Sequence, residues 1–319
     1  MQLMVAMRCG PDVAEEWTFR LFRRQHNEKF LSSFDKLGLN GLPDAVACAR
    51  YHALANSMGG VPVHYIYESD RKAWVRFRYP RWMFQGPTLC GIPVEVSRGV
   101  LRGWYAHNGV SLGNPRLGFV CVSEDMTGEF GLCGYFYEFD DELNDDERLQ
   151  FAKDESPPAY DPAQQPRPPD SEWNSERLEK ANRNYALAYV RNGLVELSAV
   201  IGIDRAIEIG KLSARLTGLQ YFQETADMVK AVDGDVGDAL TYLKRMFEGM
   251  GDSVIRSDTT KLEQHRPRAI RGLERDERDL VLACWSELWC GALSAQQVRK
   301  RLTVAHHEQQ SVWQVSALD

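Results

Sequence analysis

The sequence lacks the patterns on which several common assignments depend. It has no CxxC pair, and its seven cysteines are an odd number without paired spacing, which argues against a disulfide framework or a structural zinc site. No apolar run reaches the ~20 residues of a membrane helix, and Walker and GxGxxG loops are missing. We therefore expect buried free thiols in a reducing cytoplasm, no membrane span, and no P-loop, Rossmann or α/β-hydrolase fold.

Basic residues are also fewer than acidic residues. The 319 residues contain 38 Lys and Arg against 45 Asp and Glu, which gives a formal net charge of -7. Because there is no basic excess to neutralise a phosphate backbone, nucleic acid is not expected as a partner. The N-terminal stretch MQLMVAMRCGPDVAEEW has no basic flank before a long apolar run, so no signal peptide is expected and a cytoplasmic protein is predicted.

Proline, in contrast, is concentrated in one segment. SPPAYDPAQQPRPPD, residues 156–170, holds six prolines and follows the acidic run DDELNDDER. Proline fixes φ and removes a hydrogen-bond donor, so this segment is predicted to be an extended linker. The expected organisation is a first module over 1–140, an acidic and Pro-rich linker over 141–174, and a second module over 175–319.

The two halves repeat one order of elements. Helical patterns come first, then a hairpin (VPVHYIYESDRKAWVRFRYP and SVIRSDTTKLEQHRPRAI), a helix with a tryptophan, and closing strands. The helices before the hairpins end in Met-Gly, and Trp104 and Trp289 each stand thirteen residues before the leucine that opens the next strand. These anchors favour an ancient duplication and predict an α+β fold of two repeated modules, each with helices and a small antiparallel sheet.

This order of helices, hairpin, helix and strands, with a helical stretch such as LSAVIGIDRAIEIGKLSARLTGLQYFQE, resembles a known superfamily. It is similar to the 4-vinyl-reductase-like small-molecule-binding domains and, within them, to the L-2-amino-thiazoline-4-carboxylate hydrolase-like proteins. The resemblance is clearest over 194–318 and fainter over 12–138, and no motif carries family catalytic positions across. It implies an α+β domain that encloses a small organic ligand, in a family with both enzymes and sensors.

The stretch after Trp104, YAHNGVSLGNPR, differs from its counterpart after Trp289, CGALSAQQVRKR. The second continues a helix, whereas the first, after a helix expected around 94–107, is interrupted by two glycines and a proline. Glycine costs about 1 kcal/mol and proline about 3 kcal/mol within a helix. Two interpretations stay open. Either a functional site here keeps residues that destabilise a helix, or Asn-Gly simply ends the helix. His107 and Asn108 are the predicted catalytic residues, because histidine exchanges protons near neutral pH without a cofactor.

Further candidates lie on the strands. Glu124 is a third catalytic candidate, paired with Asp125, although a solvated turn is the favoured interpretation. An arginine pair beside a tryptophan on one strand face is suited to a planar aromatic carboxylate, although such faces usually meet water. The predicted substrate-binding residues on this face and on alternating positions of neighbouring strands are Trp74, Arg76, Arg78, His64, Tyr135 and Tyr137.

No His, Cys, Asp or Glu spacing matches a metal site, so neither a metal nor an organic cofactor is predicted. The sequence therefore predicts a cofactor-independent, catabolic-type enzyme for a small cyclic or aromatic carboxylate, first of all a hydrolase of a C–N bond. The alternatives are a decarboxylase or related lyase acting on an aromatic acid, and a non-catalytic small-molecule sensor. The pocket is expected among residues 48–137, with the long second-half helices as scaffold or as the surface of a homodimer.

Overall fold

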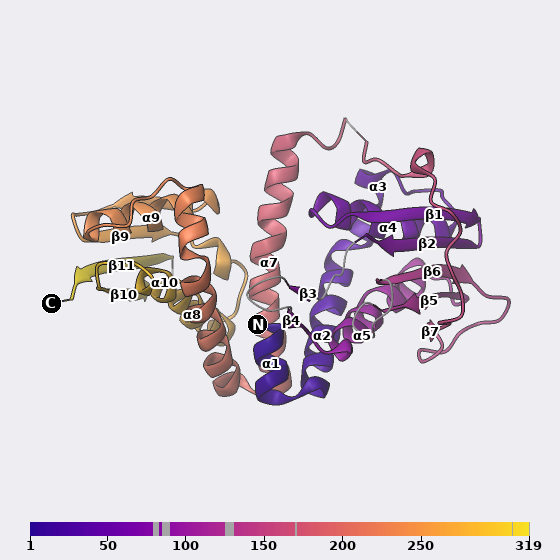
Figure 1. The fold of residues 1–319 in the computed structure, drawn as a ribbon, viewed down its shortest axis with the longest axis horizontal. Coiled ribbons are helices and arrows are strands. Elements are labelled where there is room, and N and C mark those ends of the chain that lie inside the picture. Colours follow the sequence, from indigo (N-terminus) through magenta and orange to yellow (C-terminus); the bar gives the residue numbers. More distant parts are fainter. Residues whose placement is uncertain (79–82, 85–89, 125–130, 170, 308, 319) are drawn as a thin grey trace. The chain divides into compact units, whose positions relative to one another are not determined.

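A computed structural model of the protein describes residues 1–78, 83–84, 90–124, 131–169, 171–307 and 309–318 (Figure 1). The chain forms two compact units, Gln2–Asn182 and Arg183–Asp319, and Met1 is grouped with the second. Both units combine helices with mainly antiparallel sheets, so the predicted α+β class is confirmed. No helix within these described ranges is long and apolar enough to cross a membrane.

The first unit consists of helices and a five-stranded sheet. Its helices are α1 (Gln2–Cys9), α2 (Pro11–Lys29), α3 (Phe34–Leu37), α4 (Asp44–Met58), α5 (Val94–Gly103) and α6 (Asn108–Leu112). Its strands are β1 (Val63–Ser69), β2 (Lys72–Phe77), β3 (Met83–Phe84), β4 (Cys90–Gly91), β5 (Leu117–Ser123), β6 (Cys133–Glu138) and β7 (Leu149–Phe151). The main sheet has the order β1-β2-β6-β5-β7, and only its β5–β7 pair is parallel, while β3 and β4 pair with each other.

The second unit repeats this plan with longer helices. Helix α7 (Ser175–Ile201) begins in the first unit and continues into the second. The remaining elements are α8 (Ile203–Met228), α9 (Val236–Gly249), β8 (Ser253–Arg256), β9 (Lys261–His265), α10 (Arg275–Ser294), β10 (Lys300–His307) and β11 (Gln310–Ala317). Its antiparallel sheet has the order β10-β11-β9-β8.

The two sheets have the same strand order. In each, the second strand of the hairpin, β2 or β9, pairs with the last long strand, β6 or β11, which pairs in turn with the strand before it, β5 or β10. Helix α4 packs across β1, β2 and β6, and α9 packs in the same way across β8, β9 and β11. Helix α2 packs on α5, and α8 packs on α10 (Figure 1). A different strand order would contradict the duplication, so the shared order supports it.

The paired helices approach each other closely in both units, through glycines of α5 in the first unit and through glycines of both α8 and α10 in the second. A Cβ at Gly103 of α5 would lie 2.5 Å from the Phe19 carbonyl oxygen of α2. In the second unit a Cβ at Gly218 of α8 would collide with the Leu288 carbonyl oxygen of α10. Leu288 immediately precedes Trp289, as Gly103 immediately precedes Trp104, so the close contact has the same place in both units.

The first sheet is covered on both faces. Helix α4 covers one face, and the other carries a cluster that includes Ile66, Trp74 and Tyr135, against which Ala152 and Tyr160 of the returning chain pack. The predicted linker, residues 141–174, thus lies within the first unit. The expectation that the Trp74 face meets water is wrong for Trp74, which is 1% exposed, because the chain after β6 folds back over it.

Candidate functional site

The predicted break after Trp104 is a turn that feeds β5. Helix α5 ends at Gly103, earlier than expected, and a short 3-10 turn, η2 (Tyr105–His107), leads into α6. Helix α6 ends at Gly113, whose φ of 70° is left-handed and favours glycine. A Cβ at Gly109 would collide with the Leu117 carbonyl oxygen, so this position also requires glycine. The two glycines are therefore explained by the turn, and the polar residues beside them need a separate explanation.

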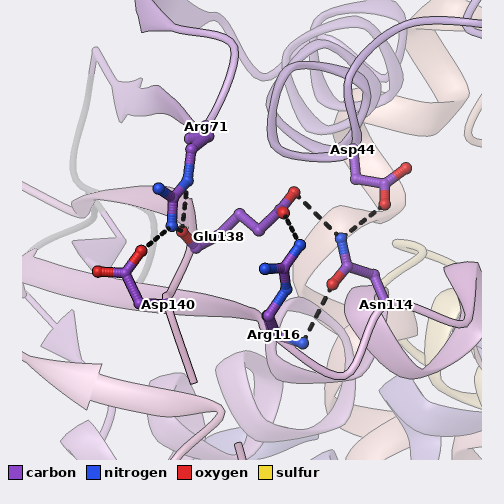
Figure 2. Close-up of polar contacts among 6 residues, drawn as sticks. All are labelled: Asp44, Arg71, Asn114, Arg116, Glu138 and Asp140. Atoms are coloured by element: carbon purple, nitrogen blue, oxygen red, sulfur yellow. Dashed lines mark hydrogen bonds and ion pairs between the residues drawn. The ribbon is translucent and has the colours of Figure 1, made fainter. Parts of the chain in front are cut away.

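A polar network fixes the end of this turn (Figure 2). The Asn114 amide donates to Asp44 at 2.8 Å and to Glu138 at 3.3 Å, and its oxygen accepts from the Arg116 backbone N–H at 3.0 Å. The Arg116 guanidinium pairs with Glu138 at 2.6 Å. Arg71 bridges the Glu138 carbonyl oxygen and Asp140. These groups satisfy one another, so the network positions α4, the turn and β6 and leaves no group aimed at a ligand.

Three histidines gather around Trp104 on the α4 side of the sheet. The His26 ring lies 5.1 Å from His107 and 6.2 Å from Trp104, and the His52 ring also lies 6.2 Å from Trp104. The Asn108 amide donates to His52 Nε2 at 3.0 Å. We call His26, His52, Trp104, His107 and Asn108 the histidine cluster. Its members come from α2, α4 and the α5–α6 junction, far apart in the sequence.

The environment of the cluster keeps two of its histidines neutral. The pKa of His107, which is half-buried, is lowered to about 4 by burial first and then by Arg23 and Arg148. His26 is 1% exposed, and burial, His107 and Arg23 together lower its pKa to about 3. Both rings are therefore neutral at pH 7, when they can donate and accept hydrogen bonds.

Several buried polar atoms of the cluster lack a hydrogen-bond partner among the described residues. They are Nδ1 of His26, Nε1 of Trp104 and Oδ1 of Asn108. Asn108 is fully buried, and beside it the pKa of the Cys48 thiol is raised well above its usual range by burial. Buried polar atoms in native proteins are nearly always paired, so these exceptions call for an explanation such as a bound water or ligand.

Ser111 joins the cluster and is not among the residues predicted from the sequence. Its Oγ lies 2.8 Å from His26 Nε2, within hydrogen-bond distance. The signal that could have found it is the GxSxG spacing of Gly109, Ser111 and Gly113, a motif that the expectation of no α/β-hydrolase fold wrongly treated as absent from the sequence. The strand-turn-helix context of an α/β-hydrolase is absent here, because Ser111 lies on α6 between a 3-10 turn and a glycine turn.

Arg148 is a second residue that sequence reasoning missed. Its side chain is 12% exposed, and its nearest carboxylate, that of Asp145, is 3.6 Å away and 99% exposed. Nε has no hydrogen-bond partner in the part of the chain that the structure describes, and Nη1 makes a long 3.4 Å contact with the Leu117 carbonyl oxygen. Gly109, two residues after His107, packs against that same carbonyl. A poorly compensated, buried cation thus lies at the start of β5, near the histidine cluster.

The predicted substrate-binding residues lie on the opposite face of the sheet. The cross-strand pairs His64–Arg76 and Trp74–Tyr135 place these four residues on one face, and Tyr137, two residues beyond Tyr135, shares it. His52 stacks on Phe136, which alternates with Tyr135 and faces α4. The structure therefore gathers the predicted binding residues but separates them from His107 and Asn108.

That opposite face is occupied by the protein itself. The Lys72 ammonium lies 4.1 Å from the Tyr135 ring centre and 4.9 Å from that of Trp74, and it pairs with Glu68 and Glu155. His64 stacks on Tyr160 at 3.7 Å. Arg78, just beyond β2, is exposed. The aromatic and charged groups of this face are engaged with each other and with the returning chain.

Glu124 is buried rather than solvated, which corrects the favoured interpretation. Its carboxylate, 1% exposed, pairs in a bidentate manner with Arg98 at 3.1 and 3.2 Å and lies 3.6 Å from Lys153. Asp125 lies outside the described residues. Cys121 and Cys133 are buried free thiols, and burial raises the pKa of Cys133 to about 12, which does not suit a nucleophile.

The second unit has no equivalent of the histidine cluster at its matching tryptophan. The ring neighbours of Trp289 are Tyr242, Phe247 and Trp285, so its surroundings are aromatic. Within the described ranges of both units, no group of three or more His, Cys, Asp or Glu side chains is placed to hold a metal ion. No protein-family model, curated protein or solved structure matches this chain.

Proposed function

We propose that the protein is a hydrolase that cleaves a C–N bond in a small cyclic or aromatic carboxylate at the histidine cluster of the first unit. The observation that carries the proposal is the half-buried, neutral His107 ring. It lies 5.1 Å from a second histidine, and no hydrogen bond to it is formed by the described residues. A neutral imidazole with unoccupied nitrogens can accept one proton and donate another, which is what hydrolysis needs.

The reaction consumes one water. The water oxygen ends on the carbon, the C–N bond breaks, and the nitrogen leaves with a proton delivered by His107, which regains one from water. The Asn108 amide is fully buried and donates to His52, so it positions His52 beside the site. Trp104 and the neighbouring aromatic rings supply apolar contact for a planar substrate.

Arg148 supports the carboxylate part of the proposal. A largely buried guanidinium whose one ion-pair partner among the described residues, Asp145, is fully solvated can gain from a second, less solvated anionic partner. A carboxylate bound to Arg148 would also offset one of the positive charges that lower the pKa of His107, and so make His107 a stronger base when substrate is present. In this proposal Arg148 replaces the predicted pair of Arg76 and Arg78.

The test is turnover of a panel of aromatic and heterocyclic carboxylates, followed as ammonia or amine release, with CO₂ release recorded for the lyase alternative. His107→Ala should lower turnover by about 100-fold or more and leave the melting temperature nearly unchanged. The exposed His307 provides a matched control, and His307→Ala should behave like the wild type. Full activity of His107→Ala, or absence of turnover across the panel, would contradict the proposal.

A specific observation also favours a second candidate, a ligand-binding sensor. An anionic aromatic ligand held between the half-buried His107 ring and the Arg148 guanidinium needs hydrogen bonding and charge alone, without any proton transfer. A sensor should bind benzoate and quench Trp104 fluorescence without converting any carboxylate of the panel. Benzamide, which lacks the charge, should bind more weakly if Arg148 is the partner.

A further inference from the structure

The hydroxyl of Ser111 has an uncommon hydrogen-bond arrangement. Its one hydrogen-bond partner among the described residues is His26 Nε2, at 2.8 Å. Ser111 is half-buried, so its oxygen can be reached, whereas His26 is 1% exposed. When the His26 proton is on Nδ1, Nε2 accepts a hydrogen bond from the Ser111 hydroxyl. This is the geometry of a nucleophile beside its base.

The rest of the site holds the His26 ring in place. It stacks on Phe30 at 4.6 Å, and Trp104 and His107 meet it edge-on. In the part of the chain that the structure describes, no carboxylate bonds to His26 Nδ1. Packing therefore holds the ring in place, a role that the third catalytic residue has in a triad. The positively charged groups near His26 and His107 are Arg23 and Arg148, and Asp145 is the nearby carboxylate.

The second unit contains a serine–histidine pair that differs in one decisive respect. Ser286 Oγ lies 3.1 Å from His306 Nε2, but its hydroxyl also donates to the Leu282 carbonyl oxygen at 2.8 Å. His306 Nδ1 bonds to Ser311 at 2.8 Å. With the hydroxyl proton committed to a carbonyl, Nε2 of His306 must donate rather than accept, so Ser286 is not activated.

We propose that Ser111 is a catalytic nucleophile and that His26 is its general base. The substrate and the C–N cleavage rest on the proposed function, whereas the activated serine rests on its own geometry. Ser111 Oγ forms a bond to the electrophilic carbon as its proton moves to His26, and the C–N bond then breaks as His26 passes that proton to the leaving nitrogen and becomes neutral again. Water next attacks the resulting ester, gives its proton to His26, and releases the acid while Ser111 regains its hydrogen. One water is consumed in total.

A serine-directed sulfonyl fluoride tests this without knowledge of the substrate. The full-length protein is treated with phenylmethylsulfonyl fluoride, and adducts are located by peptide mass spectrometry. Ser111 should form the adduct and Ser286 should not. Ser111→Ala should remove it, and His26→Gln, which keeps a polar side chain of similar reach, should slow labelling by about 100-fold or more.

The pH profile separates an activated serine from one that is merely accessible. Because His26 is already neutral above pH 5, labelling of wild-type Ser111 should be nearly flat from pH 5 to 8. An ordinary hydroxyl reacts as its anion, so its labelling rate rises about tenfold per pH unit. His26→Gln should change the flat profile into the steep one. If His26→Gln fails to fold, the wild-type profile and the comparison with Ser286 still decide the matter.

Absence of an adduct on Ser111, equal labelling of Ser286, or a steep profile in the wild type would overturn the proposal. Labelling at Ser111 without turnover of any carboxylate would leave the nucleophile in place and contradict the proposed function. Turnover that persists in Ser111→Ala would support the proposed function and contradict the role of Ser111 as nucleophile, because water would then be the attacking group.

Discussion

Acidification tests the environment of His26. Its side chain is 1% exposed, and its pKa is lowered from 6.5 to about 3, first by burial and then by His107 and Arg23. Below pH 6.5 the unfolded chain takes up a proton at this residue, whereas the folded protein does not until about pH 3. The stability that the neutral ring contributes is therefore complete above pH 6.5 and is lost as the pH falls toward 3.

The size of the effect follows from the shift. One pKa unit corresponds to about 1.36 kcal/mol, and pH 5 lies about 1.5 units below the ordinary histidine pKa. Lowering the pH from 7.5 to 5 should thus remove about 2 kcal/mol of unfolding free energy through His26. Urea denaturation of the wild type and of His26→Gln at both pH values measures it. The stability difference between the two proteins should shrink by about 2 kcal/mol at pH 5, because glutamine takes up no proton.

The other histidines are the same in both proteins, so contributions that do not depend on His26 cancel in this comparison. The exposed His307 gives a control, and His307→Gln should retain the pH dependence of the wild type. Parallel pH profiles for the wild type and His26→Gln would refute the reasoning. An NMR titration that places the His26 pKa near 6.5 would refute it as well.

Three further substitutions probe the first unit. Gly109→Ala should lower the free energy of unfolding by about 3 kcal/mol, measured by urea denaturation, because its Cβ would collide with the carbonyl at the start of β5; a neutral result would remove the steric explanation of the turn. Glu124→Gln should cost about 2 kcal/mol by removing a charge-assisted, bidentate hydrogen bond from a buried carboxylate, since Arg98 itself is 39% exposed and can turn to water, and a loss below about 1 kcal/mol would mark the pair as no stronger than a surface one. Gln165→Ala should speed hydrogen exchange of the Tyr65 amide, which donates to the Gln165 side chain, and unchanged exchange would show that this bond does not protect the edge of β1.

The order of helices and strands was predictable because it depends on local patterns. The alternating hairpin strands, the glycine stops and the strands on either side of residues 125–130 all occur where periodicity places them. The return of residues 139–165 over the first sheet could not be read in this way. It depends on contacts between distant residues, such as the Tyr160–His64 stack and the two hydrogen bonds of Gln165 with β1.

The candidate site was predictable only in part, for the same reason. His107 and Asn108 could be singled out because the local pattern breaks beside them. His26 and Arg148 lie 81 and 41 positions from His107, and nothing in their own surroundings marks them. The arginine and aromatic residues of β2 and β6 were correctly expected to share a face, since alternation fixes that, but alternation does not reveal what covers the face.

The glycines at the helix crossings also affect how the chain reaches its fold. Two halves with the same plan can misassemble during folding if a helix of one half docks on the partner belonging to the other. Gly103 of α5 and Gly291 of α10 both meet a backbone carbonyl of the facing helix, so these crossings do not by themselves reject the wrong helix. Chain length does distinguish them, because α5 begins 65 positions after the end of α2, whereas α10 begins 246 positions after it. The smaller entropy cost of the shorter loop therefore favours pairing within each half.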